Sequence, residues 1–227
     1  MLAELTRQDQ IANDLANSST PGYKADRSAQ AGFGDLVLAN TMTGEAVGRA
    51  GLGVQIDATV TDVAQAPLRE TGEPLDVALQ GDGFLAVQTP QGVRYTRNGQ
   101  LELDAKGGLV TSTGYAVLDD AGKPIQLKPG AQHTIAADGL VDGSPRLGVV
   151  SLANPIKQGD SLFAGTAGAR PPATQVKQGY LEGSGVDPAR AMVDMIVSMR
   201  AYEATQRVIH AIDDTLGKGI QSAGGGA

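Results

Sequence analysis

The sequence predicts an α+β protein: helices at the N- and C-termini pair as a coiled-coil-like axial domain, and a mainly antiparallel all-β domain lies between them in sequence. Three observations predict this class. Apolar residues recur at helical spacing near both ends of the 227-residue chain. Short alternating runs separated by turn residues fill the middle. The 31 Gly and 11 Pro fit a chain with many tight turns.

The first helix is expected over residues 1–17. Met1, Leu5 and Leu15 fall on one face of such a helix, and most polar side chains fall on the other. The helix is expected to end near Asn17, because Ser18-Ser19-Thr20-Pro21-Gly22 follows. Pro21 biases the residue before it away from helical geometry, and Gly22 permits a turn.

The second helix is expected from Pro188 to Leu216. Asp187 supplies an N-cap, and Pro188 stands at the first helical position. A helix over 188–216 is about 43 Å long at 1.5 Å per residue. Two heptad positions define its seam: Met195, Tyr202, Ile209 and Leu216 at one, and Met192, Met199, Gln206 and Asp213 at the other. The pattern fits either an ordinary core helix or a helix that pairs with a partner, and its length favours the partner helix.

The stretch between the helices divides into two parts. Residues 25–70 hold short apolar clusters among Gly, Thr and Ala, and we expect an extended connector there. Residues 71–183 are expected to form the β-rich domain, since alternating runs recur about every 8–12 positions without a helical pattern between them. The axial helical domain then comprises residues 1–24 and 184–227.

Strands are expected at 75–79, 84–87, 93–96, 101–103, 109–111, 115–118, 125–127, 134–136, 140–141 and 148–152. Turn residues separate them, as at Pro90-Gln91-Gly92. Asn98-Gly99 stands between two alternating runs and predicts a hairpin between 93–96 and 101–103. Residues 165–175, which include Pro171-Pro172, are expected to form a surface loop.

The composition excludes several classes of function. Without Cys, the chain forms no disulfide, no thiolate metal site and no Cys nucleophile. Its net charge of −7 argues against a nucleic-acid partner, which usually requires a basic surface. No apolar run of about 18 residues exists to span a membrane, and no secretory signal pattern opens the chain.

Candidate catalytic residues are few. His133 lies in the β region and His210 lies beside the seam of the second helix, and both fit structural or surface roles better than general-base catalysis. Asp82 stands between two glycines, where Asp usually serves the turn. No phosphate-binding loop, dinucleotide fingerprint or nucleophile elbow occurs. We therefore expect no enzymatic activity, no metal, no cofactor and no small-molecule substrate.

Three separated motifs resemble those of the bacterial flagellar rod and hook protein family. The N-terminal motif runs over 11–24, the middle motif combines 74–84 with 95–99, and the C-terminal motif spans 178–187, 192–196 and 200–203. Asp14 and Gly185 stand where Asn is more common in that family. The matching residues of the N-terminal motif are Ala12, Asn13, Leu15, Ala16, Asn17, Thr20, Pro21, Gly22, Tyr23 and Lys24.

The resemblance implies a structural subunit of the flagellar basal-body rod, the periplasmic drive shaft for motility in the cell envelope. Family members polymerise helically through their terminal helices and are exported by the flagellar type III apparatus without a cleavable signal peptide. The implied partners are further copies of the chain and other rod and hook axial proteins. The assembly interface expected from the seam and the resemblance is Ile11, Leu15, Met192, Met195, Met199, Tyr202, Ile209 and Leu216.

Three questions stay open at the level of sequence. The short segment between Phe33 and Gly81, with the runs at 74–80 and 182–195, resembles the proximal-rod type, and a distal-rod or hook-type subunit is the alternative within the family. A soluble β-domain adhesin or binding module with a helical stalk is the alternative from another class. Family members usually begin upstream of the first helix, so whether Met1 is the true start is also open.

Overall fold

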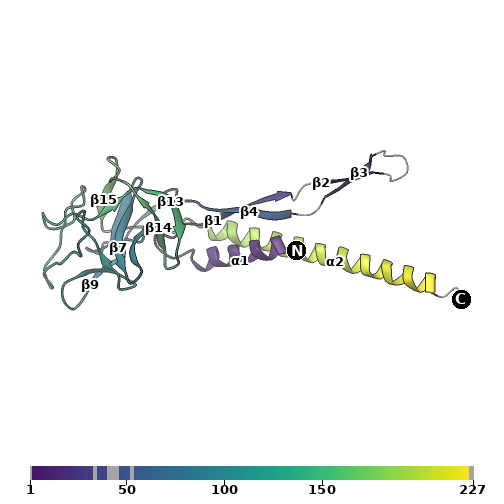
Figure 1. The fold of residues 1–227 in the computed structure, drawn as a ribbon. Helices are drawn as coiled ribbons and strands as arrows, with labels where there is room; N and C mark the ends of the chain where they lie inside the picture. The colour runs from purple at the N-terminus through teal and green to yellow at the C-terminus, as the bar shows by residue number, and fades with distance from the viewer. Residues whose placement is uncertain (1, 33–34, 40–45, 52–53, 225–227) are drawn as a thin grey trace. The chain divides into compact units, whose positions relative to one another are not determined.

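The computed structural model describes residues 2–32, 35–39, 46–51 and 54–224 (Figure 1). The chain divides into two compact units. The helical unit consists of Met1–Ala16, Asp26–Val60 and Pro188–Ala227, and the β unit consists of Asn17–Ala25 and Thr61–Asp187. The domain boundaries expected from the sequence, at 24/25, 70/71 and 183/184, remain a prediction.

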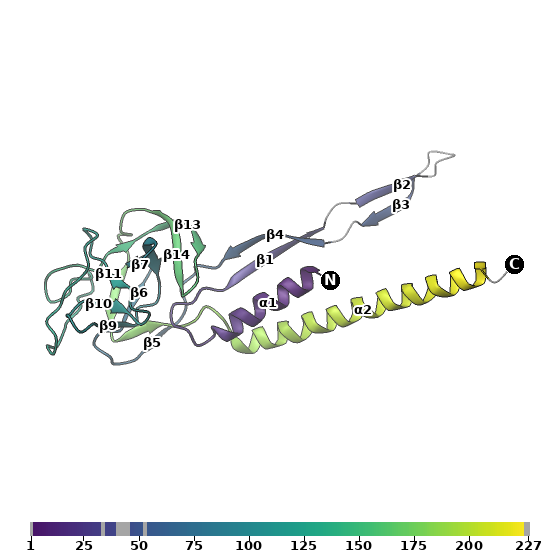
Figure 2. The same ribbon diagram turned by 60° about the horizontal axis from the view of Figure 1, so that its bottom comes forward.

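The helical unit is built on two helices, α1 (Leu2–Ala16) and α2 (Pro188–Gly224). They are in contact and lie side by side in both views, α1 in purple and α2 in yellow-green (Figures 1 and 2). In the same unit β1 (Asp26–Gly32) pairs with β4 (Val54–Thr61), and β2 (Asp35–Ala39) pairs with β3 (Ala46–Gly51). The contact between the terminal helices confirms the predicted pairing.

The second helix begins at the predicted residue and extends further than predicted. It passes Leu216, continues through Gly217 and Gly219, and covers 37 residues, or about 55 Å. An interior Gly weakens a helix by only about 1 kcal/mol relative to Ala, so two isolated glycines do not end it. Neither helix of the described residues has an apolar stretch long enough to cross a membrane.

The largest sheet that the described residues form lies in the β unit and has eight strands. Its order is β13-β14-β8-β7-β11-β10-β9, with β12 paired to β7, and its neighbouring strands are antiparallel. The strands are β7 (Phe84–Thr89), β8 (Gly92–Thr96), β9 (Leu101–Leu103), β10 (Leu109–Thr111), β11 (Ala116–Val117), β12 (Val149–Val150), β13 (Leu152–Lys157) and β14 (Leu162–Ala167). The central antiparallel β domain is thus confirmed.

Two further strand pairs bring early and late parts of the β unit together. β6 (Val77–Gln80) pairs with β15 (Gln175–Gln178), and β5 (Leu68–Glu70) pairs with β16 (Tyr180–Glu182), both antiparallel. The chain therefore returns, just before α2, to segments that it laid down about a hundred residues earlier. This return brings separate parts of the sequence to one place in the β unit.

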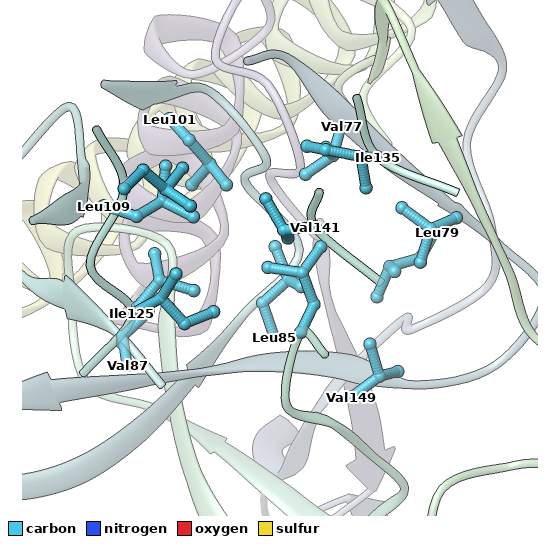
Figure 3. Packing of buried hydrophobic residues seen from close by; sticks show 14 of the residues in the cluster. Val77, Leu79, Leu85, Val87, Leu101, Leu109, Ile125, Ile135, Val141 and Val149 are labelled. Atoms are coloured by element: carbon cyan, nitrogen blue, oxygen red, sulfur yellow. The ribbon is translucent and has the colours of Figure 1, made fainter. Parts of the chain in front are cut away.

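The core of the β unit is aliphatic, as expected for a chain with 4% aromatic residues. Leu, Val and Ile side chains from Val77 to Val176 form one buried cluster (Figure 3). Phe84 and Phe163 are also buried, and their ring centroids lie 5.3 Å apart. The β unit thus contains its own closed hydrophobic core.

The predicted hairpin at Asn98-Gly99 is wrong. β8 pairs with β7 and β14, whereas β9 pairs with β10. The Val77 amide donates to the Gly99 carbonyl at 2.9 Å, and a Cβ on Gly99 would lie 1.7 Å from the Val77 carbonyl oxygen. This Gly therefore permits a close backbone approach rather than a two-residue turn. The turn predicted at Pro90-Gln91-Gly92 does join β7 to β8, with Thr89 opposite Gly92.

Residues 118–147 form successive turns with isolated bridges in place of several predicted strands. The predicted strand at 125–127 is reduced to the bridge Gly108↔Gln126, and the predicted strands at 134–136 and 140–141 are reduced to the bridges Ile135↔Val141 and Leu140↔Arg146. The Gly-containing turns lie too close together for longer ladders to form between them. The predicted loop at 165–175 is shorter, because β14 reaches Ala167 and β15 begins at Gln175.

Candidate assembly surface and motif junction

One face of α2 packs against α1. Ala191, Met195, Ser198 and Tyr202 follow at spacings of four, three and four residues, which places them on one side of the helix. Ala191 and Ser198 are buried, and the other two are half-buried. The Ser198 hydroxyl donates to a carboxylate oxygen of Glu4 at 3.0 Å. This hydrogen bond identifies the stripe as the face that contacts α1.

The matching face of α1 mixes polar and apolar side chains. Glu4, Gln8, Ile11 and Leu15 are half-buried and repeat the spacing of four, three and four residues. The Gln10 amide also donates to the carbonyl of Asp26, at the start of β1. Side-chain hydrogen bonds therefore fix α1 both to α2 and to the first strand of the helical unit.

The predicted interface residues fall into two groups by exposure. Ile11 and Leu15 on α1, with Met195 and Tyr202 on α2, are half-buried in the single chain. Met192, Met199, Ile209 and Leu216 are exposed. The heptad pattern therefore combined positions on the α1-facing stripe with positions that the single chain leaves in solvent, and their common role in assembly remains a prediction.

The first half of α2 carries a second apolar face. Met192, Val193, Ile196, Val197 and Met199 are each 50–58% exposed. At about 100° per residue, they are centred roughly opposite the stripe that contacts α1. Contiguous exposed apolar side chains of this kind mark interaction surfaces. The heptad analysis missed Val193, Ile196 and Val197 because it followed a single seam. A helix with two apolar faces requires a separate search for a second set of apolar positions.

The second half of α2 extends the α1-facing stripe. Val208, Ile209, Ile212 and Leu216 are 41–59% exposed. At about 100° per residue, Ile209 and Leu216 continue on the side of Ala191 and Tyr202, whereas Ile212 and Val208 lie progressively farther round the helix. The described α1 has 15 residues and α2 has 37. The stripe is thus partly covered by α1 and then continues as exposed surface.

The three motifs meet within the β unit at Glu182. Lys24 comes from the N-terminal motif, Arg97 from the middle motif, and Glu182 from the C-terminal motif and the end of β16. The Lys24 ammonium donates to Glu182 Oε1 at 2.5 Å, and Arg97 Nη1 donates to Glu182 Oε2 at 3.2 Å. The three side chains are each at most 2% exposed. We call Lys24, Arg97 and Glu182 the motif junction.

Hydrogen bonds to the main chain extend the motif junction to the segment before β5. The amide of Ala66 donates to Glu182 Oε1 at 2.8 Å, and Lys24 Nζ donates to the carbonyl of Ala64 at 2.7 Å. The amide of Asp62 donates to the carbonyl of Ala25 at 2.8 Å. Residues 62–66 are therefore fixed to the N-terminal motif and to Glu182 together.

Gly22 joins the N-terminal motif to the other two. Its amide donates to the main-chain carbonyl of Glu182 at 2.9 Å. Its φ is +66°, and a Cβ on it would lie 2.3 Å from the carbonyl carbon of Arg97. Backbone conformation and lack of space both disfavour an L side chain here. The Pro21-Gly22 pair of the motif is thus explained by packing within the β unit.

The other residues of the N-terminal motif form the end of α1 and the turn after it. Ala12, Asn13 and Ala16 are exposed on α1. The Thr20 hydroxyl donates to the Asn17 side chain at 3.2 Å, and this bond closes the turn before Pro21. Tyr23 is buried, with Lys157 Nζ 4.2 Å from its ring centroid. Sequence analysis identified Lys24 but not Arg97 or Glu182 as a site residue.

The charge balance of the motif junction depends on Glu182. Burial lowers the pKa of the Lys24 ammonium below its ordinary value, although the hydrogen bond and charge of Glu182 oppose this. Arg97 also lies over the ring of Phe84, 5.0 Å from its centroid. Two buried cations thus share one carboxylate, and its neutralisation would leave both without their common counter-charge.

The residues considered for catalysis lie in different parts of the structure, and His133 has structural partners. His133 is buried, with Nδ1 2.6 Å from Asp142 Oδ2 and Nε2 3.1 Å from the Lys128 carbonyl. The carbonyl of Asp82 accepts a hydrogen bond from the Thr174 hydroxyl. His210 is exposed on α2. Within the part of the chain that the structure describes, no group of three or more His, Asp or Glu residues is placed to hold a metal ion.

Paired terminal helices, a central antiparallel β unit and three converging motifs define the class of flagellar rod and hook proteins. Two family models match the chain: one described as the flagellar basal body rod FlgEFG protein C-terminal region, over residues 177–222, and one as the flagellar hook protein FlgE/F/G D1 domain, over residues 78–143. Together they cover parts of both units.

Curated relatives match over nearly the whole chain. The flagellar basal-body rod protein FlgF of Escherichia coli K12 is 37% identical over 96% of this chain and 92% of its own length. FlgF of Caulobacter vibrioides is 34% identical over 88% of this chain and 85% of its own length. The rod protein FlgG of Bacillus subtilis is 33% identical over 93% of this chain and 91% of its own length. The chain belongs to the flagellar basal-body rod protein family of FlgF and FlgG. Its relatives are named as flagellar basal-body rod proteins, and the chain is a structural protein of that family rather than an enzyme.

Proposed function

We propose that this chain is a subunit of the flagellar basal-body rod that polymerises helically through its terminal helices and forms part of the periplasmic drive shaft for motility. The observation that carries the proposal is the apolar surface that α2 leaves exposed in the single chain. Membership of the rod protein family supports the identity of the polymer.

The exposed apolar side chains of α2 supply a driving force for association. They are Met192, Val193, Ile196, Val197, Met199, Val208, Ile209, Ile212 and Leu216. Complete burial of one such side chain contributes about 1.5–3 kcal/mol, and burial of the exposed half contributes roughly half of that. Contacts on two sides of one helix suit a helical polymer, because each subunit then has neighbours in more than one direction.

The proposal assigns specific partners and a location. The partners are further copies of this chain, other rod and hook axial proteins, and the flagellar type III export apparatus, which exports the subunit without a cleavable signal peptide. We place the subunit in the proximal rod, on the short segment between Phe33 and Gly81 and the runs at 74–80 and 182–195. The distal rod is the alternative position within the same family.

Labelling in isolated basal bodies tests the function and the position together. The epitope is inserted at Gly122, which lies in the β unit rather than in the helices. This turn glycine has open space around it, so the turn has room for an insertion. We expect the label on the rod near the export gate. A label next to the hook would support a distal position instead. Basal bodies without the label, isolated from cells that produce the tagged chain, would contradict the rod function and favour a binding module.

The apolar face opposite α1 provides a sharper test of the mechanism. Ile196→Asp should lower polymerisation at least tenfold, because tenfold corresponds to only about 1.4 kcal/mol and burial of an unpaired carboxylate costs more. Lys218→Asp, at an exposed polar position farther along α2, is the matched control with a larger change of charge. Polymerisation is followed by light scattering, and helix content by circular dichroism. Equal behaviour of the two variants would exclude this face from the interface.

A further inference from the structure

The chain passes between the helical unit and the β unit four times. The passages lie at 16/17, 25/26, 60/61 and 187/188. On the β-unit side they belong to only three segments, residues 17–25, 61–67 and 182–187. The covalent connections between the two units therefore all run through these three segments.

All three segments are bound to Glu182. Its carboxylate accepts hydrogen bonds from Lys24 in the first segment and from the amide of Ala66 in the second, at 2.5 and 2.8 Å. Its main-chain carbonyl accepts from the amide of Gly22, at 2.9 Å. Glu182 itself opens the third segment, and the Gly185 amide there donates to the carbonyl of Tyr23 at 2.8 Å.

The buried charges are chemically specific in a way that simple packing is not. Apolar side chains of similar size in place of all three charged residues would fill the site, and such replacements of whole buried ion pairs often leave stability unchanged or increase it. An apolar side chain at Glu182 alone would instead leave two buried cations without a counter-charge. It would not accept hydrogen bonds from an ammonium, a guanidinium and an amide at once. Arg97 adds a bond to the second carboxylate oxygen at 3.2 Å, which fixes the orientation of the carboxylate toward Lys24 and Ala66.

We propose that Glu182 is a positioning residue that fixes the segments by which the chain enters and leaves the β unit. These segments then transmit torque between the helices and the β unit without deforming under load. The torque role rests on the proposed rod function. The local role, which is the joint fixation of the three segments, rests on the hydrogen bonds of the β unit alone.

Hydrogen exchange of the purified full-length chain tests the local role. Glu182→Gln keeps the shape of the side chain and removes its charge. We expect amide exchange at least tenfold faster in peptides covering 19–26, 62–68 and 183–188 together, with a clearly smaller change in β7 and β10. Glu70→Gln is the matched control, because Glu70 is exposed on the neighbouring strand opposite Tyr180; it should leave all three peptides unchanged.

Three results would overturn the local role. One is unchanged exchange, and another is a change confined to 183–188. The third is an equal loss of protection in β7 and β10, since Glu182 would then stabilise the β unit as a whole without a specific effect on the three segments. Lys24→Met provides a second measurement that keeps the proposal testable if Glu182→Gln does not fold. This variant should speed amide exchange in 19–26 and 62–68 together, and unchanged exchange in 62–68 would overturn the proposal.

Swimming under increasing viscosity tests the torque role. The measured quantity is the swimming speed of variant cells divided by that of wild-type cells. This ratio should fall progressively with viscosity for cells whose rods contain Glu182→Gln, and it should stay constant for Glu70→Gln cells. A constant ratio for cells whose rods contain Glu182→Gln would overturn the torque role. Absence of the wild-type chain from isolated basal bodies would instead contradict the rod function and leave the exchange result intact.

Discussion

Gly22 shows how one residue of the N-terminal motif constrains the β unit. Its φ of +66° costs another residue about 1–2 kcal/mol, and the approach of a Cβ to within 2.3 Å of Arg97 adds overpacking of about 1–3 kcal/mol. We expect Gly22→Ala to lower the free energy of unfolding by roughly 2–5 kcal/mol, from these two terms. Urea denaturation measures this loss.

Gly114→Ala is the matched control for Gly22→Ala. Gly114 has a similar φ of +84°, but a Cβ at this position would meet no heavy atom within 4 Å other than those of its own chain neighbours. Gly114→Ala should therefore lower the free energy of unfolding by only about 1–2 kcal/mol, which is the cost of the positive φ alone. Equal losses in the two variants would show that the contact between Gly22 and Arg97 has no energetic consequence.

Asp142 gives the β unit a dependence on acid pH. The hydrogen bond from His133, followed by that from the Thr134 amide, lowers the pKa of this carboxyl below its ordinary value. A lowered pKa in the folded state contributes stability that is present above the unfolded pKa of about 3.9 and is lost as the pH falls through the folded pKa. We expect stability to fall with pH below about 4.

Asp142→Asn tests the origin of that acid dependence. Asn tolerates the positive φ of 50° at this position but does not ionise. Urea midpoints measured from about pH 6 to about pH 3, a range that spans the unfolded pKa of Asp, should therefore fall less steeply for the variant than for wild type. An unchanged pH profile would assign the acid sensitivity to other carboxylates of the chain.

At the scale of elements, α2 is expected to be the first part of the chain that a protease cuts. Residues 207–219 are all exposed, and an amphipathic helix without its packing partners is marginally stable in water. Trypsin should cleave after Arg207 and Lys218 well before it cuts within 77–150, and mass spectrometry of the fragments measures the order. Simultaneous cleavage of both regions would contradict helices that are completed by assembly.

The sequence predicted the elements whose signals are local. Pro188 and the turn at Pro21-Gly22 marked the helix boundaries, because caps and breakers act within a few residues. The hairpin prediction at Asn98-Gly99 failed, since the dipeptide that permits a hairpin turn also permits the close approach to Val77. The short runs after residue 118 alternate like strands, but their pairing depends on partners that the local pattern does not specify.

The motif junction could not be derived from local patterns. Lys24 and Glu182 are 158 positions apart in sequence, and Arg97 and Glu182 are 85 apart. Each residue alone has the pattern of an ordinary surface charge, because Lys, Arg and Glu are rarely buried unless paired. The resemblance identified the motifs that contain these residues, but only the fold showed that the three motifs contact one another.

At the scale of the whole molecule, the two units differ in how they bury apolar surface. The β unit encloses its aliphatic cluster, with Val87, Leu109 and Leu147 fully buried. The helical unit leaves much of the apolar surface of α2 exposed in the single chain. The β unit therefore closes its core with few aromatic residues, and the exposed apolar surface of α2 is available to neighbouring subunits in a rod.

This difference leads to a prediction for a chain that ends at Asp187. Because the core cluster lies between Val77 and Val176, the β unit should still fold cooperatively in the truncated chain. The truncated chain should nevertheless fail to enter basal bodies and fail to restore motility, because it lacks the apolar faces of α2.

Urea denaturation followed by circular dichroism measures the folding of the truncated chain, and a swimming assay measures its function. A truncated chain that restores motility would show that α2 is dispensable for the rod, and a β unit that unfolds on truncation would show that its stability depends on the helix.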